Sequence, residues 1–473
     1  MRRTVRNAGS RRPPPRAPDP GPRTRPPSPL DPPPKRPVID PQSIPSLSET
    51  HQRCVSIRSL LMPGVPAPPD MSTQPRPVYV IGAGPGGLAA AAALRARGVR
   101  AVVVEKSDDV AASWRGHYDR LHLHTTRRLS ALPGLAMPRR FGRWVSRDNV
   151  VRYLEKYAEF HGLEIVTGVE VTRIDPAPGG DGWLLHATGG RVLDARAVVV
   201  ATGFNHTPAL PDWPGRDTYT GQLLHAREYR NATPYEGRDV LVVGTGNTGA
   251  EIAVDLAEGG AVRVRLAVRT APHIVRRSTA GWPAQRSGIL VRRLPVRLVD
   301  RLCALIAKAS VPDLAAYGLP RPDTGLYSRV KEGAVPVQDV GLIDAVRAGR
   351  VEPVAAVASF DGADVVLADG SRIAPDAVVA ATGYRRGLEG LVGHLDVLDG
   401  RGRPRTHGTR SPAQAPGLYF TGFTNPISGM FREMALDAEK IAKAASRRLG
   451  PRTGLPPATP LPDTGLRPVD PLA

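Results

Sequence analysis

The sequence predicts an α/β fold with two parallel sheets, because strand–helix–strand patterns occur twice along the 473-residue chain. In both patterns a glycine-rich turn separates the first strand from the helix. The strands and helices are expected at 78–81, 88–97 and 101–104, and again at 239–243, 249–258 and 262–268.

The first glycine-rich turn has the features of a dinucleotide-binding turn. Gly82 permits the tight bend, Gly84 lets the backbone approach a pyrophosphate, and Gly87 lets the helix pack closely on the strand. The pyrophosphate then faces the helix N-terminus. Glu105, 18 residues past Gly87, is placed to accept hydrogen bonds from ribose hydroxyls. A surface turn would explain the glycines alone, but not the strand, helix and acid around them. The predicted binding residues are Gly82, Ala83, Gly84, Pro85, Gly86, Gly87 and Glu105.

The second turn repeats the pattern but carries a base where the first carries an acid. Arg269 lies 20 residues past Gly249, at the position that matches Glu105. A carboxylate would repel a 2′-phosphate, whereas a guanidinium can pair with it, so this turn is expected to bind NADP(H). A merely solvated Arg269 is the alternative. The predicted binding residues are Gly244, Thr245, Gly246, Asn247, Thr248, Gly249 and Arg269.

Two similar segments, 198–204 and 378–384, predict how the two units are connected. Each is an apolar run that ends in Ala-Thr-Gly and an aromatic residue. In nested two-dinucleotide flavoproteins the chain crosses between domains after such strands, which assigns FAD to the first turn. We therefore expect two nested Rossmann-like dinucleotide-binding domains, an FAD domain with an inserted NADP domain. The expected boundaries are an N-terminal tail at 1–76, FAD domain at 77–212 and 376–450, NADP domain at 213–375, and a C-terminal tail at 451–473.

Both tails are predicted to be disordered because they are rich in proline. Residues 1–70 hold nineteen of the fifty prolines, and Met71 stands just before the first strand. A chain that starts at Met71 is therefore expected to keep its FAD and its NADPH oxidation. An organellar transit peptide is the alternative, since the first eighteen residues are rich in arginine and free of acids.

Composition excludes several classes of function. The chain has only two cysteines, Cys54 and Cys303, which leaves no CxxC pair and no Cys/His metal cluster and favours a cytoplasmic setting. No apolar stretch is long enough to span a bilayer, and no membrane partner is expected. The net charge of +20 is spread as scattered arginine, so nucleic acid is not the expected partner. The oligomeric state stays open, a homodimer included.

Several further segments resemble the class B flavin-dependent monooxygenases, and among them the YUCCA-type indole-3-pyruvate monooxygenases and their bacterial relatives. The segment 219–229 is similar to the FxGxxxHxxxY signature through Tyr219, Gly221, His225 and Tyr229, with Tyr219 in place of Phe. The likeness covers about 77–447. The other similar segments are 118–124, 317–322, 336–341 and 417–424.

The resemblance implies a monooxygenase reaction. NADPH would reduce FAD, O₂ would add at flavin C4a, and one oxygen atom would enter a small substrate. That substrate is either an aromatic 2-oxo acid such as indole-3-pyruvate, which would be decarboxylated, or a compound with a soft N or S atom. The alternatives are an NADPH-dependent flavin reductase without oxygen insertion, and a nucleic-acid-binding or redox-sensing module.

The resemblance also implies roles for single residues. Trp114 would lie in the loop beside the flavin, and Val169 near the adenine. His124 would lie beside the flavin as the tentative catalytic residue, with a packing histidine as the alternative. His225 would brace the turn between the domains. No equivalent is evident for the Asn that many relatives carry near flavin C4a, so the residues that stabilise the oxygen adduct are not identified.

Overall fold

The computed structural model describes residues 76–279, 281–292 and 294–449. The tails predicted at 1–76 and 451–473 lie outside these residues except for Arg76. The prediction that a chain starting at Met71 is sufficient therefore falls outside the described part.

The first sheet is parallel and has the strand order β22-β7-β1-β2-β3. Four of its strands precede residue 201, and the chain adds the fifth, β22, more than 200 residues later. This return shows that the sheet encloses an insertion. The strands are β1 Val78–Ile81, β2 Ala101–Val104, β3 Glu164–Val166, β7 Ala197–Val200 and β22 Leu418–Phe420.

The second sheet, also parallel, is built entirely from the inserted segment, with the order β16-β11-β10-β20-β9. The helix α4, Asn247–Glu258, connects β10 to β11. The predicted nested α/β fold is confirmed. The strands are β9 Gln222–His225, β10 Asp239–Val243, β11 Arg263–Val268, β16 Glu352–Ala355 and β20 Ala377–Ala380.

The two repeated Ala-Thr-Gly segments follow β7 and β20, one in each sheet. β20 pairs with β10 and β9, so it belongs to the second sheet although it begins after residue 375. The second sheet thus extends past the boundary expected from the sequence. The chain returns to the first sheet only at β22, because β20 still pairs with strands of the second sheet.

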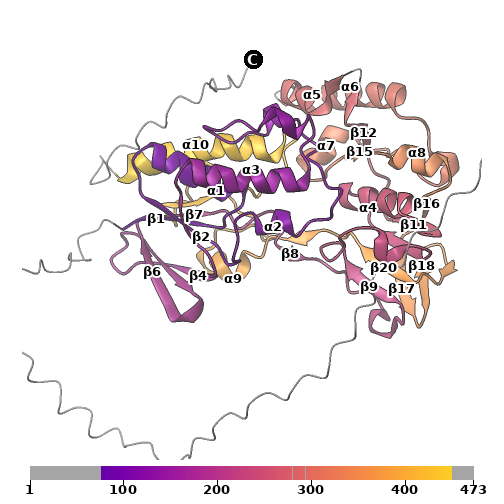
Figure 1. Ribbon diagram of the computed structural model, residues 1–473, viewed down its shortest axis with the longest axis horizontal. Coiled ribbons are helices and arrows are strands. Elements are labelled where there is room, and N and C mark those ends of the chain that lie inside the picture. Colours follow the sequence, from indigo (N-terminus) through magenta and orange to yellow (C-terminus); the bar gives the residue numbers. More distant parts are fainter. Residues whose placement is uncertain (1–75, 280, 293, 450–473) are drawn as a thin grey trace, which may run out of the picture. The chain divides into compact units, whose positions relative to one another are not determined.

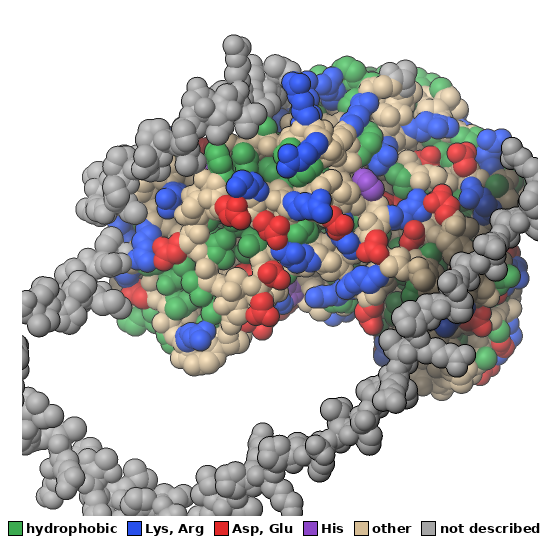
Figure 2. Space-filling view, viewed as in Figure 1, with side chains coloured by type: hydrophobic (Ala, Val, Ile, Leu, Met, Phe, Trp, Pro, Cys, Tyr) green, Lys and Arg blue, Asp and Glu red, His purple; other side chains and the backbone are tan. Residues whose placement is uncertain are grey.

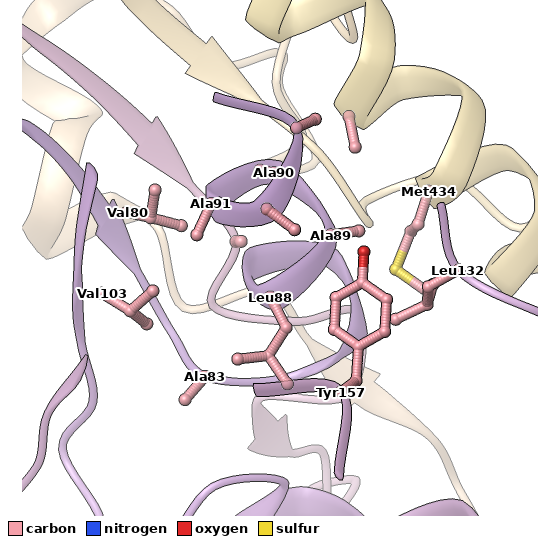
Figure 3. Packing of buried hydrophobic residues seen from close by; sticks show 14 of the residues in the cluster. Val80, Ala83, Leu88, Ala89, Ala90, Ala91, Val103, Leu132, Tyr157 and Met434 are labelled. Carbon is pink, nitrogen blue, oxygen red and sulfur yellow. The ribbon is translucent and has the colours of Figure 1, made fainter. Parts of the chain in front are cut away.

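Helices α1, Pro85–Ala96, α3, Arg147–Phe160, and α10, Met430–Leu449, lie on one side of the first sheet, and the β4–β6 sheet lies on the other (Figure 1). Leu88 of α1 lies between Val103 and Tyr157, and the small side chains of Ala89–Ala91 let neighbouring elements approach closely (Figure 3). Residues 85–94 of α1 are all buried. This packing fixes the direction in which the first turn faces.

Both glycine-rich turns are shorter than predicted. α1 begins at Pro85 rather than Leu88, and α4 begins at Asn247 rather than Gly249. Proline suits the first turn of a helix, because the N–H that it lacks would have no partner there. Glycine lowers helix propensity but does not prevent a first turn whose positions are set by packing.

The remaining elements form smaller sheets and connecting helices. The helices are α2 Ala112–Arg115, α5 Ala284–Val291, α6 Val296–Ser310, α7 Leu326–Lys331, α8 Leu342–Arg347 and α9 Glu389–Val392. The strands are β4 Val171–Pro176, β5 Trp183–Ala187, β6 Arg191–Ala195, β8 Thr207–Pro208, β12 Ile274–Arg276, β13 Ser278–Thr279, β14 Trp282–Pro283, β15 Val337–Asp339, β17 Val357–Asp361, β18 Asp364–Leu367, β19 Arg372–Ile373 and β21 Tyr384–Arg385.

Candidate active site

The first glycine turn is closed against protein at two glycines and open at the third. Gly82 has a φ of +105°, and a Cβ there would lie 2.7 Å from the carbonyl oxygen of Ala201. A Cβ on Gly87 would lie 1.8 Å from the carbonyl oxygen of Gly82. A Cβ on Gly84 would meet no protein atom within 4 Å. Gly82 and Gly87 therefore make the turn, and Gly84 leaves room beside it.

Glu105 lies directly against this turn. Its Oε2 accepts a hydrogen bond from the N–H of Ala83 at 2.7 Å, and its Oε1 accepts one from the N–H of Ser107 at 3.0 Å. Val169 is buried, and its N–H donates to the carbonyl of Glu105 at 3.0 Å. Turn, acid and Val169 thus lie together.

Trp114 sits on the short helix α2, which is tied to the same turn. The N–H of Ala111 donates to the carbonyl of Ala83 at 3.0 Å. The Trp114 ring meets Phe431, at the start of α10, edge to face at 5.6 Å, and lies 5.8 Å from His117. Trp114 therefore lies between α10 and the 117–126 loop. Gly86 closes the same corner, since a Cβ there would lie 3.1 Å from Sδ of Met434.

The second turn has the same geometry as the first. Gly244 has a φ of +112°, and a Cβ there would lie 2.6 Å from the carbonyl oxygen of Ala381. A Cβ on Gly249 would lie 1.9 Å from the carbonyl oxygen of Gly244, while Gly246 has no protein atom within 4 Å of that position. The two glycine-rich turns, far apart in the sequence, thus have the same geometry, each with one open glycine.

Of the residues predicted to bind a ligand at the second turn, Arg269 has no protein partner among the described residues, whereas Asn247 and Thr245 do. Arg269 is exposed directly after β11 and pairs with no other described residue. Asn247 is committed to the protein, because its Nδ2 donates to the carbonyl of Pro336 at 3.2 Å and its Oδ1 accepts from the N–H of Gln338 at 2.7 Å. The Thr245 hydroxyl donates to the carbonyl of Thr270 at 3.3 Å.

A groove of about 670 Å³ opens beside this turn. Thr245, Gly246 and Thr270 form one wall. His273, Arg321 and Arg329 add cationic or polar side chains to the lining, which also includes Asp323. The groove therefore suits an anionic ligand next to the α4 N-terminus.

The four signature residues have structural contacts. Tyr219 donates its hydroxyl to the carbonyl of Pro375 at 2.7 Å, and a Cβ on Gly221 would collide with the Tyr219 ring. Tyr229 donates its hydroxyl to Oδ2 of Asp255 at 2.6 Å. The tyrosines on either side of β9 thus bond to neighbouring protein segments, and neither contacts a glycine-rich turn in these hydrogen bonds.

His225 is buried beside the β20 crossover. Its Nδ1 accepts from the N–H of Arg227 at 3.1 Å, so Nε2 carries the proton and donates to the carbonyl of Gly383 at 3.0 Å. Burial lowers the pKa of His225, which keeps the ring neutral. These contacts tie the end of β9 to the segment after β20, and the bracing role of His225 stays a prediction.

His124 is paired with Glu251, an acid that the sequence analysis missed. Glu251 lies on α4 and is only 3% exposed, and its Oε1 pairs with Nε2 of His124. Burial and the Glu251 charge raise the pKa of Tyr118, so its hydroxyl stays protonated beside this carboxylate. The pair joins the loop after α2 to the helix of the second turn. The sequence signal that could have identified Glu251 is its place as an acid one helical turn into α4, the helix that follows the second glycine-rich turn.

His117 differs from His124 in its surroundings. Burial, with the charges of Arg230, Arg147 and Arg227, lowers the pKa of His117 to about 4. His117 is therefore neutral at pH 7, and protonating it costs folding stability as pH falls from about 6.5 toward 4. Of the two histidines, only His124 contacts a buried acid, Glu251.

Comparison with known proteins decides the family. The family described as pyridine nucleotide-disulphide oxidoreductase matches residues 79–281. Indole-3-pyruvate monooxygenase YUCCA1 of Oryza sativa subsp. japonica is 38% identical over 351 residues, which cover 73% of this chain and 86% of that protein. The chain belongs to the class B flavin-dependent monooxygenase family. Another member, the probable indole-3-pyruvate monooxygenase YUCCA9 of Arabidopsis thaliana, is 35% identical over 77% of this chain and 87% of its own length.

Solved structures show the same fold. A flavin-containing monooxygenase from Stenotrophomonas maltophilia matches 78% of this chain and 99% of its own, with a TM-score of 0.59 and 23% identity. Cyclohexanone monooxygenase bound to epsilon-caprolactone matches 78% of this chain and 86% of its own, with a TM-score of 0.58 and 22% identity.

Membership defines the enzyme class and the cofactors. The protein is an NADPH-dependent flavin monooxygenase that uses FAD and NADPH. Both glycine turns have room for a dinucleotide, because within each turn one glycine, Gly84 or Gly246, leaves space that protein does not fill. Within the described ranges no three His, Cys, Asp or Glu residues gather to hold a metal ion. No helix in those ranges combines the length and apolarity needed to cross a bilayer.

Proposed function

We propose that the first turn of this monooxygenase binds FAD and the second binds NADPH. The opposite charges of Glu105 and Arg269 support this order. Glu105 offers its carboxylate beside the first turn, where a ribose with free hydroxyls is accepted and a 2′-phosphate is repelled. Arg269 leaves its guanidinium unpaired among the described residues at the matching place, where a 2′-phosphate is attracted.

The other predicted residues act by position. Gly82, Gly87, Gly244 and Gly249 shape the turns, and the first N–H groups of α1 and α4 face the pyrophosphates. Val169 packs beside Glu105 at the adenine end, and Trp114 borders the flavin side with Phe431. Asn247 and Tyr118 hold the α4 side of the site in place.

Bound FAD and NADPH supply hydride transfer and the activation of O₂. The chain binds and orients them and excludes water between its two halves. His124 is proposed to position a proton at Nε2 beside the reacting centre, with the buried Glu251 side chain holding the ring in orientation.

We further propose that the substrate is an aromatic 2-oxo acid of the indole-3-pyruvate type. The observation that carries this proposal is the match to indole-3-pyruvate monooxygenases over 86–87% of their length. In the overall reaction the bond between the carbonyl carbon and the carboxylate breaks. One oxygen atom of O₂ enters the new carboxylate, the other leaves as water, and CO₂ is released while NADPH is oxidised.

Product analysis under ¹⁸O₂ tests the substrate class. With indole-3-pyruvate and NADPH we expect indole-3-acetate that carries one ¹⁸O atom, with CO₂ released in equal amount. Phenylpyruvate serves as a second 2-oxo acid, and a tertiary amine and a thioether serve as comparison substrates. Label found only in an N-oxide or a sulfoxide would overturn the 2-oxo acid proposal. Hydrogen peroxide as the sole product with every substrate would favour a reductase.

Glu251 and His124 are expected to be strongly coupled. Glu251→Ala leaves His124 and Tyr118 without their buried hydrogen-bond partner, so the free energy of unfolding should fall by about 1–3 kcal/mol. Chemical denaturation of Glu251→Ala, His124→Ala and the double variant gives the coupling energy, which should exceed about 1 kcal/mol. The exposed Lys156–Glu159 pair is the control, with an expected coupling of about 0.2–0.5 kcal/mol. Equal coupling energies in the two pairs would show that burial adds nothing to the His124–Glu251 contact.

A further inference from the structure

A row of large apolar side chains is exposed on α5, α6 and the turn between them. Leu290 is 69% exposed and Leu305 is 65% exposed. Figure 2 shows hydrophobic side chains beside Lys and Arg along the upper edge, where Figure 1 places these helices. The row consists of Leu290, Leu294, Leu298, Leu302, Leu305 and Ile306.

This row is a second apolar face of α6, because the helix already packs inward on its other side. Val299 is fully buried, and Cys303 and Ala307 line a cavity of about 230 Å³ beneath the helix. With about 3.6 residues per turn, Leu298, Leu302 and Leu305 lie within one narrow outward stripe. The stripe is therefore not needed to hold α6 on the protein.

Cations run along one edge of the stripe. Arg297, Arg301 and Lys308 follow at the helical angles next to the leucines, all three are exposed, and none pairs with another described residue. The single acid of α6, Asp300, faces inward, where it accepts hydrogen bonds from the N–H groups of Tyr327 at 2.6 Å and Ser328 at 3.2 Å. The outward side of α6 is thus apolar and cationic without a compensating acid.

From this arrangement we propose that α5 and α6 dock the enzyme on the surface of an anionic lipid bilayer. The leucines enter the boundary between headgroups and acyl chains, and the three cations contact lipid phosphates. An apolar protein partner would need no row of unpaired cations, whereas an anionic bilayer satisfies both features. The sequence predicts no membrane partner from segment length alone, but surface docking by an amphipathic helix does not need a segment long enough to span a bilayer.

Vesicle flotation of the full chain tests this proposal. We expect binding to phosphatidylcholine vesicles that contain phosphatidylglycerol, little binding to phosphatidylcholine alone, and weaker binding at high salt. Arg297→Gln with Arg301→Gln should lower partitioning about thirtyfold at low salt. Leu298→Ser, Leu302→Ser and Leu305→Ser together should lower it at least about tenfold.

Matched variants separate the docking surface from general charge and apolarity. Arg347→Gln with Arg350→Gln removes two exposed arginines from another surface, and Val192→Ser with Val262→Ser removes two exposed apolar side chains. Both controls should bind vesicles like the parent chain. Absence of vesicle binding, or equal losses in the α6 variants and the controls, would overturn the proposal. Light scattering tests whether a second copy of the chain covers this surface instead. A parent chain that is dimeric, does not bind vesicles and becomes monomeric in the leucine variant would overturn the proposal in favour of self-association.

Discussion

Replacing Gly84 with alanine is expected to remove FAD from the protein while leaving its fold unchanged. A Cβ at this position meets no protein atom within 4 Å, and the residue has an extended backbone that alanine adopts. A pyrophosphate at the turn would collide with the new methyl group. The affinity for FAD should therefore fall by roughly 1–3 kcal/mol, or about 5- to 150-fold. Flavin content after purification and thermal unfolding of the flavin-free protein measure the two effects separately.

Gly87→Ala provides the contrasting variant. Its Cβ would lie 1.8 Å from the carbonyl oxygen of Gly82, an atom of the backbone that cannot rotate away. This variant should lose both the flavin and the fold, whereas Gly84→Ala loses only the flavin. If Gly84→Ala kept a full complement of FAD, the first turn would not be the pyrophosphate site.

Arg269→Ala is expected to change the choice of nicotinamide cofactor. The guanidinium has no partner among the described residues that would compete with a 2′-phosphate. Its loss should cost about 1.5–3 kcal/mol of NADPH binding, seen as a KM raised about 10- to 150-fold. The KM for NADH should stay nearly unchanged, because NADH lacks the phosphate.

The matched control is Arg350→Ala, which removes an exposed arginine three residues after the end of α8. It should leave both KM values unchanged. Equal losses with NADPH and NADH in Arg269→Ala would mean that the residue supports the fold rather than the phosphate. Full retention of NADPH preference would assign the phosphate to other cations of the groove, Arg321 and Arg329.

The parts of the site that were predictable from sequence are those that backbone geometry dictates. Gly82, Gly87, Gly244 and Gly249 are required where a Cβ would strike a carbonyl oxygen, so their spacing alone locates both turns. Glu105 and Arg269 follow because each stands directly after the neighbouring strand of a parallel sheet. The nested order follows from the repeated Ala-Thr-Gly strands.

Side-chain pairing across the two halves was not predictable in this way. Glu251 meets His124 through a contact between segments 127 residues apart, and no periodicity encodes such a distance. Asn247 has the position of a ligand contact but its amide is used by the protein. β20, which begins just after the boundary expected at 375, pairs with β10 and β9, a partnership that its sequence alone does not specify.

Some expectations stay predictions. They are the sufficiency of a chain that starts at Met71, the cytoplasmic setting, the absence of a nucleic-acid partner and the oligomeric state.

The central claim is that two separate turns hold FAD and NADPH, and that NADPH bound at the second turn passes its hydride to FAD bound at the first. Anaerobic rapid mixing of Gly246→Ala with NADPH tests it most directly, because Gly246 is as open as Gly84 and the variant should fold and keep FAD. The parent enzyme should lose its yellow flavin absorbance on mixing. Gly246→Ala should keep that colour with NADPH at the same concentration and lose it only with dithionite. Reduction of the variant by NADPH at the parent rate would contradict the claim.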